Sequence, residues 1–88
     1  MTKLEEKLLK LGYKYVKRKD SWIKYKDYPI EIIIMYDLFI EKLDGWLSFN
    51  NFAIRSRESF KKCINDIESL YEELQKDLEV LKEYEENK

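Results

Sequence analysis

Histidine is absent from this chain of 88 residues, and cysteine occurs only once. Without histidine the chain lacks the side chain that most often serves as general base, metal ligand or proton switch near neutral pH. Cys63 cannot form an internal disulfide, and its position beside an apolar helical stripe indicates a small buried hydrophobic side chain. We therefore expect no cofactor, no metal site and no enzymatic activity.

Glycine and proline are also scarce, and long apolar runs are missing. The two glycines, Gly12 and Gly45, cannot form a phosphate-binding loop, and no cysteine or acidic spacing matches a zinc or calcium site. No stretch approaches the roughly 20 apolar residues that span a bilayer, and the N-terminus lacks the order of a signal peptide. These absences predict one cytoplasmic domain over residues 1–88, without membrane contact.

Charged and aromatic side chains, by contrast, are abundant. Charged residues make up 40% of the chain, yet 44% hydrophobic and 15% aromatic residues are too many for a disordered segment. Residues 1–29 hold nine lysines and arginines against four acids, whereas residues 57–88 hold six against ten. Either the two halves attract each other, or each half meets a different kind of partner.

Capping signals mark two helices of very different length. Thr2 and Glu5 have the spacing of a capping box, and Gly12 suits a left-handed C-terminal cap, which predicts a helix at about 3–11. Ser56 resembles an N-cap, and nothing after it breaks a helix at about 57–85.

Between these helices, alternating aromatic, β-branched and basic residues predict strands. Asp44-Gly45 is a hairpin signal and places the last strand after it. The expected strands occupy about 13–19, 21–27, 30–37 and 46–54. The fold class is therefore α+β, with an antiparallel sheet of three to four strands and the long C-terminal helix packed across one face.

An apolar residue recurs along the long helix at alternating steps of four and three, the spacing of a heptad. The series is Phe60, Ile64, Ile67, Tyr71, Leu74, Leu78 and Leu81. A helix of this length reaches roughly 43 Å, whereas a strand of six residues covers about 20 Å, so the sheet cannot cover all of it. We expect residues up to Tyr71 to pack on the sheet. Leu74, Leu78 and Leu81 then need either the first helix or a second copy, which would give a homodimer.

The same helix carries many acids without a nearby cation. The candidates for binding a partner are Glu68, Glu72, Glu73, Asp77, Glu79 and Glu83. These carboxylates are either an ordinary solvated face or an imitation of nucleic-acid phosphates that occupies a basic groove on a partner.

A second candidate surface lies on the sheet, where both faces of the third strand are apolar at the centre. The face without helices should show a set drawn from Trp22, Ile33, Met35 and Trp46, beside lysines. A competing interpretation is a nucleic-acid or regulatory surface made by Lys14, Lys17, Arg18, Lys24, Lys26 and Trp22. Lysine outnumbers arginine fourteen to three and no RNA-binding motif is present, so nucleic acid is not expected as a direct ligand.

The segments "LEEKLLKLGYKY", "IRSRESF" and "LQKDLEVLKEYEENK", with aromatic strands between them, resemble small accessory proteins of phages of Gram-positive bacteria. The resemblance covers most of the chain in layout and contains no catalytic motif. It implies a non-enzymatic inhibitor that binds a host defence protein, as anti-CRISPR proteins bind Cas nucleases. A Cas9-type nuclease is thus the expected partner, and a structural homodimer without inhibitory role is a further alternative.

Overall fold

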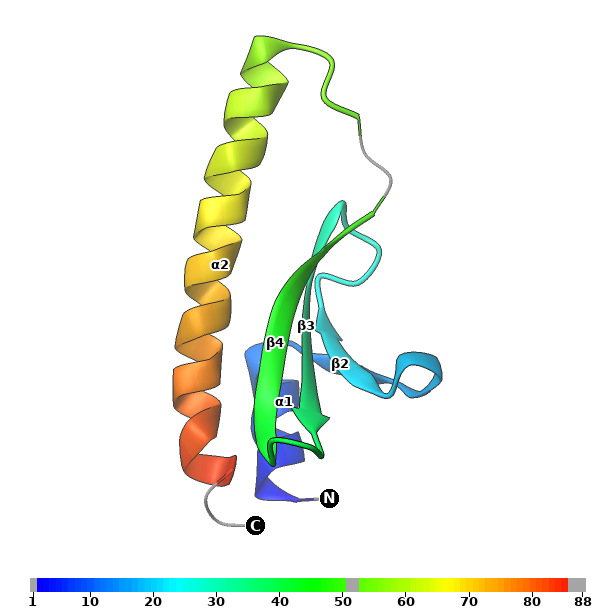
Figure 1. Cartoon of the computed structure of the whole chain (residues 1–88), viewed down its shortest axis with the longest axis vertical. Coiled ribbons are helices and arrows are strands. Elements are labelled where there is room, and N and C mark those ends of the chain that lie inside the picture. Colours follow the sequence, from blue (N-terminus) through cyan, green and yellow to red (C-terminus); the bar gives the residue numbers. More distant parts are fainter. Residues whose placement is uncertain (1, 51–52, 86–88) are drawn as a thin grey trace.

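The computed structural model describes residues 2–50 and 53–85. Its elements follow in the order α1 (Lys3–Leu11), β1 (Lys14–Val16), the 3-10 turn η1 (Lys17–Lys19), β2 (Ser21–Lys24), β3 (Ile30–Asp37), β4 (Lys42–Phe49) and α2 (Arg57–Glu85). Figure 1 shows one antiparallel sheet with the long helix α2 beside it. The predicted α+β layout is confirmed.

Both helices begin where their capping residues predict, and α1 also ends at its predicted cap. The Thr2 hydroxyl accepts a hydrogen bond from the Glu5 N–H at 3.1 Å, and the Glu5 carboxylate accepts one from the Thr2 N–H. Gly12 closes α1 with φ at 102°, a conformation that glycine adopts without strain. At the start of α2, the Ser56 hydroxyl accepts a hydrogen bond from the Ser59 N–H at 3.1 Å.

The four strands form an antiparallel meander in the order β1-β2-β3-β4. The third strand has its predicted bounds, but the first two end earlier than predicted because the chain turns through η1 and then through Tyr25 and Asp27, which have positive φ. The fourth strand is Lys42–Phe49 rather than 46–54, and residues 51 and 52 of the predicted strand lie outside the described residues.

The predicted hairpin at Asp44-Gly45 is wrong, because Gly45 lies inside β4 and pairs with Ile34. The turn comprises residues 38–41, between Asp37 and Lys42, the last pair of the β3–β4 ladder. A Cβ on Gly45 would lie 2.7 Å from Leu74 Cδ1 of α2. Glycine is therefore present for the close approach of a helix and not for a turn.

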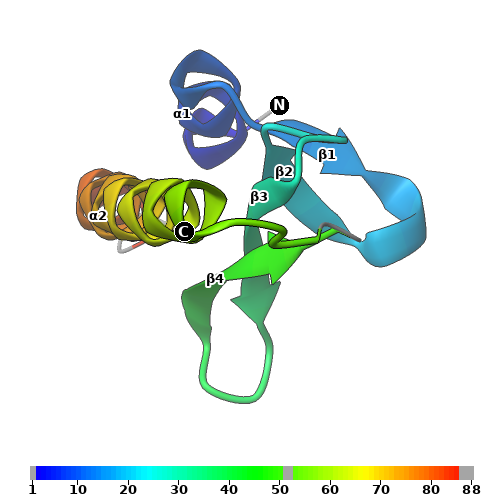
Figure 2. The same ribbon diagram turned by 90° about the horizontal axis from the view of Figure 1, so that it is seen from above.

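Both helices pack on the same face of the sheet, as Figure 2 shows from above. The core on this face comprises Leu4, Leu8, Tyr13, Ile32, Ile34, Leu74 and Leu81. Burial of these side chains removes apolar surface from water, which is the main favourable contribution to folding. The core thus joins α1, β3 and one half of α2.

That half is the C-terminal one, so the expectation about α2 is reversed. Leu74 and Leu81 are 1% and 0% exposed, and Leu78 packs against the same core. Helix α1 supplies the cover that these leucines need, so none of the three forms an open seam for a second copy. The first half of α2 instead extends beyond the sheet (Figure 1).

Candidate functional site

The turn between β3 and β4 carries three consecutive apolar side chains in solvent. Leu38, Phe39 and Ile40 are 80%, 99% and 56% exposed. We call these three residues the apolar tip. Figure 2 shows that this turn projects away from both helices. Contiguous exposed apolar side chains often mark a contact site, because exposing them to water is unfavourable unless a partner covers them.

The backbone of the apolar tip is ordered by Asp37, the residue that precedes the tip. Asp37 Oδ1 accepts hydrogen bonds from the N–H of Phe39 at 2.8 Å and of Ile40 at 3.4 Å. The turn closes at Glu41, whose φ is 55°. An aspartate that bonds the backbone two residues ahead forms an Asx turn, which fixes the loop without a partner. A partner that bound this ordered turn would therefore cost less conformational entropy than one that bound a flexible loop.

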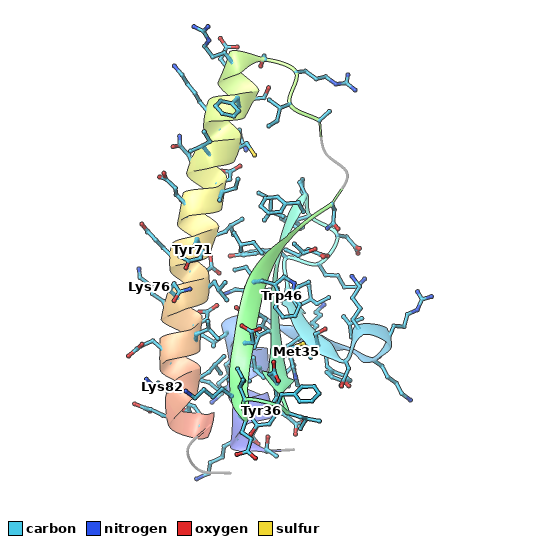
Figure 3. The ribbon with its side chains drawn as sticks, viewed as in Figure 1. Met35, Tyr36, Trp46, Tyr71, Lys76 and Lys82 are labelled. Carbon is cyan, nitrogen blue, oxygen red and sulfur yellow. The ribbon has the colours of Figure 1, made fainter. Side chains whose placement is uncertain are left out.

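Two hollows adjoin the tip. One, of about 450 Å³, is lined by residues that include Trp22, Met35, Leu38 and Phe39. The other, of about 500 Å³, lies between α1 and the sheet. Tyr15, Trp22 and Tyr36 line both hollows. Figure 3 shows Met35 and Tyr36 at the end of the sheet that carries the turn. The tip and these hollows together offer both an inserting and a receiving apolar surface.

Away from the tip, a buried ionic network fastens α2 to the sheet. Asp77 is 6% exposed and accepts hydrogen bonds from the Tyr13 hydroxyl at 2.7 Å and from Lys24 Nζ at 3.0 Å. The Lys24 ammonium also pairs with Glu73, which accepts a hydrogen bond from the Tyr25 hydroxyl at 2.8 Å. Each charge of the network thus has an opposite charge or a hydroxyl beside it, as burial requires.

The network shifts the protonation of its members. Burial raises the pKa of Tyr13 far above its ordinary value of 10.0, and the hydrogen bond to Asp77 raises it further. Burial opposes the charged forms of Lys24 and Glu73, but their hydrogen bonds and the opposite charges beside them together outweigh it, so the pKa of Lys24 is raised and that of Glu73 is lowered. The ion pair is therefore kept charged across neutral pH.

The six acids that the sequence predicts for partner binding fall into two groups in the structure. Asp77 is buried and Glu73 is half-buried, and both serve the internal network. The other four are exposed on the side of α2 opposite the core, at spacings of four, seven and four: Glu68, Glu72, Glu79 and Glu83. We call these four residues the acidic stripe.

The predicted apolar patch on the sheet does not form as a unit. Ile33 is buried, and it faces Trp46 across the β3–β4 ladder. Trp22 pairs with Ile34 and packs against the core, so it lies on the helix face and not on the face of Ile33. Strand alternation therefore separates Trp22 from the predicted set, whereas Ile33, Met35 and Trp46 share the face without helices. Met35 and Trp22 instead meet at the hollow beside the tip.

The basic set predicted for nucleic acid is also divided. Lys24 is held by Asp77 and Glu73, and Trp22 packs against Tyr15 with the rings tilted by 57° and their centroids 5.5 Å apart. Lys14, Lys17, Arg18 and Lys26 remain exposed, but Lys26 pairs with Asp27. Base stacking needs a free aromatic face beside cations, and the structure does not assemble these residues into one such surface.

The apolar tip was not among the sites predicted from the sequence. The available signal is the string "DLFIEK", in which an aspartate precedes three apolar residues and two charges. That pattern fits an Asx turn, but it also fits a continuing buried strand. Burial alone decides between them, and burial is a tertiary property.

In residues 2–50 and 53–85 no group of three acids or cysteines is arranged to hold a metal ion. No described helix is long and apolar enough to cross a membrane. No protein-family model, curated protein or solved structure matched this chain. The evidence on function therefore comes from the apolar tip and the acidic stripe.

Proposed function

We propose that this chain is a non-enzymatic protein-interaction module that blocks a host protein by stoichiometric binding. The observation that carries the proposal is the apolar tip, an ordered turn with three apolar side chains and a fully exposed phenylalanine. Aromatic anchors that fill a pocket on the partner supply most of the free energy in many interfaces. Phe39 is the anchor of this surface.

The acidic stripe is the second element of the proposal. Its four carboxylates lie on the exposed side of α2, where they attract a basic surface on the partner and increase the rate of association. A nuclease that holds guide RNA or DNA in a basic channel presents such a surface. The resemblance to small phage proteins suggests a Cas9-type nuclease as the host protein, which makes the chain an anti-CRISPR inhibitor.

The test is affinity capture from lysate of a Gram-positive host, followed by titration of the captured protein against purified variants. Phe39→Ser should weaken binding at least about 30-fold, because a buried aromatic anchor is worth 2 kcal/mol or more. The matched control is Tyr28→Ser, which removes an aromatic ring of 61% exposure from the turn at the other end of β3. Equal affinities of the two variants would refute the role of the tip.

The nuclease is tested separately. Cleavage of a DNA target by a Cas9-type nuclease is measured while the chain is titrated, and inhibition should reach its limit near one chain per nuclease. Glu72→Lys/Glu79→Lys should weaken inhibition and reduce its dependence on salt. Full cleavage at a tenfold excess of wild-type chain would reject this partner while leaving the tip experiment intact.

A further inference from the structure

The first half of α2 carries an apolar stripe that the rest of the chain does not cover. Phe60, Ile64 and Tyr71 are 48%, 40% and 55% exposed, and Ile67 is half-buried. We call these four residues the free stripe. It continues the heptad of Leu74, Leu78 and Leu81 toward the end of α2 that extends beyond the sheet (Figure 1). Its spacing is that of a helix that packs against another helix.

Two charges flank the free stripe on one side. Lys61 follows Phe60 and Glu68 follows Ile67, so they occupy the same position in successive heptads. Both are exposed, and neither forms an ion pair with any residue in the described part of the chain. The neighbouring Lys62, in contrast, pairs with Asp66 of the same helix at 3.1 Å. The charges beside the stripe are thus of opposite sign and unused within the chain.

We propose that the free stripe binds a second copy of itself in an antiparallel two-helix contact. In this arrangement Phe60 packs beside Tyr71 of the second copy, and Ile64 packs beside Ile67 of the second copy. Lys61 then lies next to Glu68 of the second copy, and the two-fold axis repeats the pair. This arrangement therefore forms four apolar layers between the two helices. It also forms two ion pairs, each between Lys61 of one copy and Glu68 of the other.

A parallel arrangement of the same stripes lacks this complementarity. Residues that flank a parallel seam pair between positions five apart, which would place Lys61 near Ser56 and Glu68 near Cys63. Neither contact joins opposite charges. The charge pattern therefore selects the antiparallel orientation.

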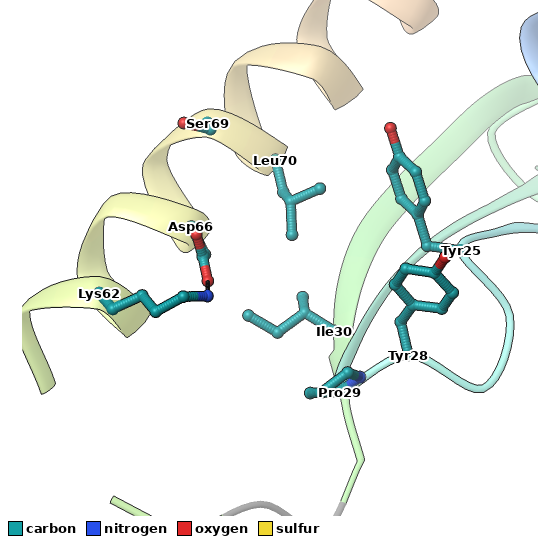
Figure 4. A pocket seen from close by; sticks show the side chains of 8 residues that line it. All are labelled: Tyr25, Tyr28, Pro29, Ile30, Lys62, Asp66, Ser69 and Leu70. Carbon is teal, nitrogen blue, oxygen red and sulfur yellow. Dashed lines mark hydrogen bonds and ion pairs between the residues drawn. The ribbon is translucent and has the colours of Figure 1, made fainter. Parts of the chain in front are cut away.

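The other flank of the stripe is apolar. Cys63 and Leu70 occupy it, and Leu70 also lines a groove of about 350 Å³ between α2 and the β2–β3 turn. Figure 4 shows Leu70 and Ile30 in this groove, with Tyr25 and Tyr28 beyond them. In the antiparallel contact Cys63 approaches Leu70 of the second copy, so apolar surface next to the groove is covered as well.

The contact is short. From Phe60 to Tyr71 the helix rises about 17 Å, which is less than the extent of a standard interface. We expect a dissociation constant in the range of about 10 to 100 µM and a monomer at nanomolar concentration. The inference stands independently of the proposed function, because it is measured on the purified chain alone.

The test is sedimentation of full-length chain, in reducing buffer, from about 1 to about 500 µM. Wild type should shift from one to two chains per particle. Lys61→Glu and Glu68→Lys should each weaken the dimer about tenfold, because each variant sets two like charges together. An equimolar mixture of the two variants should dimerise like wild type, since every pair between them is again of opposite sign.

The matched control is Lys76→Glu, an exposed charge reversal on the half of α2 that packs on the core. It should leave the dimer constant unchanged. Circular dichroism checks that all variants are folded. A wild-type chain that stays monomeric at the highest concentration would overturn the proposal. A mixture of the two variants that stays as weak as each variant alone would also overturn it.

Discussion

Single residues decide whether α2 stays on the sheet, and Asp77 is the clearest case. A carboxylate buried to this degree destabilises a fold unless hydrogen bonds replace its water. Tyr13, just before β1, and Lys24 of β2 supply those bonds. The sequence presents Asp77 as one more acid on a charged helix, because its burial depends on where the helix lies on the sheet.

Tyr13→Phe removes one of the two donors to Asp77 and leaves the ring in place. We expect the free energy of unfolding to fall by about 1–3 kcal/mol, the usual effect of leaving a buried acceptor unsatisfied. Urea denaturation measures it. The control is Tyr15→Phe, which removes a hydroxyl that bonds Asp20 on the surface. Its effect should stay below about 0.5 kcal/mol, and a loss as large as that of Tyr13→Phe would contradict the buried role.

Glu73 makes stability depend on pH. Its pKa is lowered from the ordinary value of 4.5, because hydrogen bonds from Lys24 and Tyr25 outweigh the opposing effect of burial. The ionised form is therefore stabilised by folding, and this contribution is present above pH 4.5 and lost as pH falls through the lowered pKa. Glu73→Gln should be less stable than wild type at pH 7, with the difference closing below pH 4.5.

Thermal unfolding at several pH values checks this dependence. Glu72→Gln is the control, because Glu72 is the adjacent residue and lies exposed on the acidic stripe. Its difference from wild type should not change with pH. A constant difference for Glu73→Gln over the same range would show that the ion pair with Lys24 does not stabilise the fold.

At the scale of elements, local signals predict ends better than they predict contacts. Both helices start at residues whose side chains cap them, and α1 stops at the left-handed Gly12, because such caps depend only on neighbours in sequence. The hairpin prediction was wrong because the dipeptide Asp44-Gly45 is compatible with two structures. It can form a turn, and it can also lie in a strand where a helix packs closely against the glycine. The choice depended on Leu74, which is 29 positions away along the chain.

The heptad explains why the packed half of α2 could not be predicted. Its apolar residues repeat with the same spacing from Phe60 to Leu81, so the pattern contains no information on which part the sheet covers. Leu74 and Leu81 are buried because α1 and Gly45 lie opposite them. The partner-binding acids were only partly predicted for the same reason. Helical periodicity shows which residues share a face of α2, but it does not show which of them another element covers.

Gly45→Ala tests the approach of α2 to β4. The added Cβ would lie 2.7 Å from Leu74 Cδ1 and 3.3 Å from the Ile33 carbonyl oxygen. We expect a loss of about 1–3 kcal/mol in the free energy of unfolding, because the packed layers must separate. In a Leu74→Ala background the same change should be nearly neutral, since the clashing methyl is gone. Equal losses in both backgrounds would disprove the contact.

At the scale of the whole molecule, the chain is 47 Å long and 25 Å across. The apolar tip lies at one end of this length and the first half of α2 at the other (Figure 1). An antiparallel dimer would therefore carry two tips that face away from the shared contact. Such a particle could engage two partner molecules, or two sites on one partner, with the gain in apparent affinity that bivalency brings.

The central claim is that α2 is anchored on the core from Leu70 onward, which leaves the beginning of the helix and the tip as surfaces for other chains. Amide hydrogen exchange along α2, at a concentration low enough for the monomer, tests it most directly. Amides of residues 74–84 should exchange at least about 100-fold more slowly than those of residues 58–66, because only the former lie on the core. Equal protection along the whole helix, or slower exchange in residues 58–66, would contradict it.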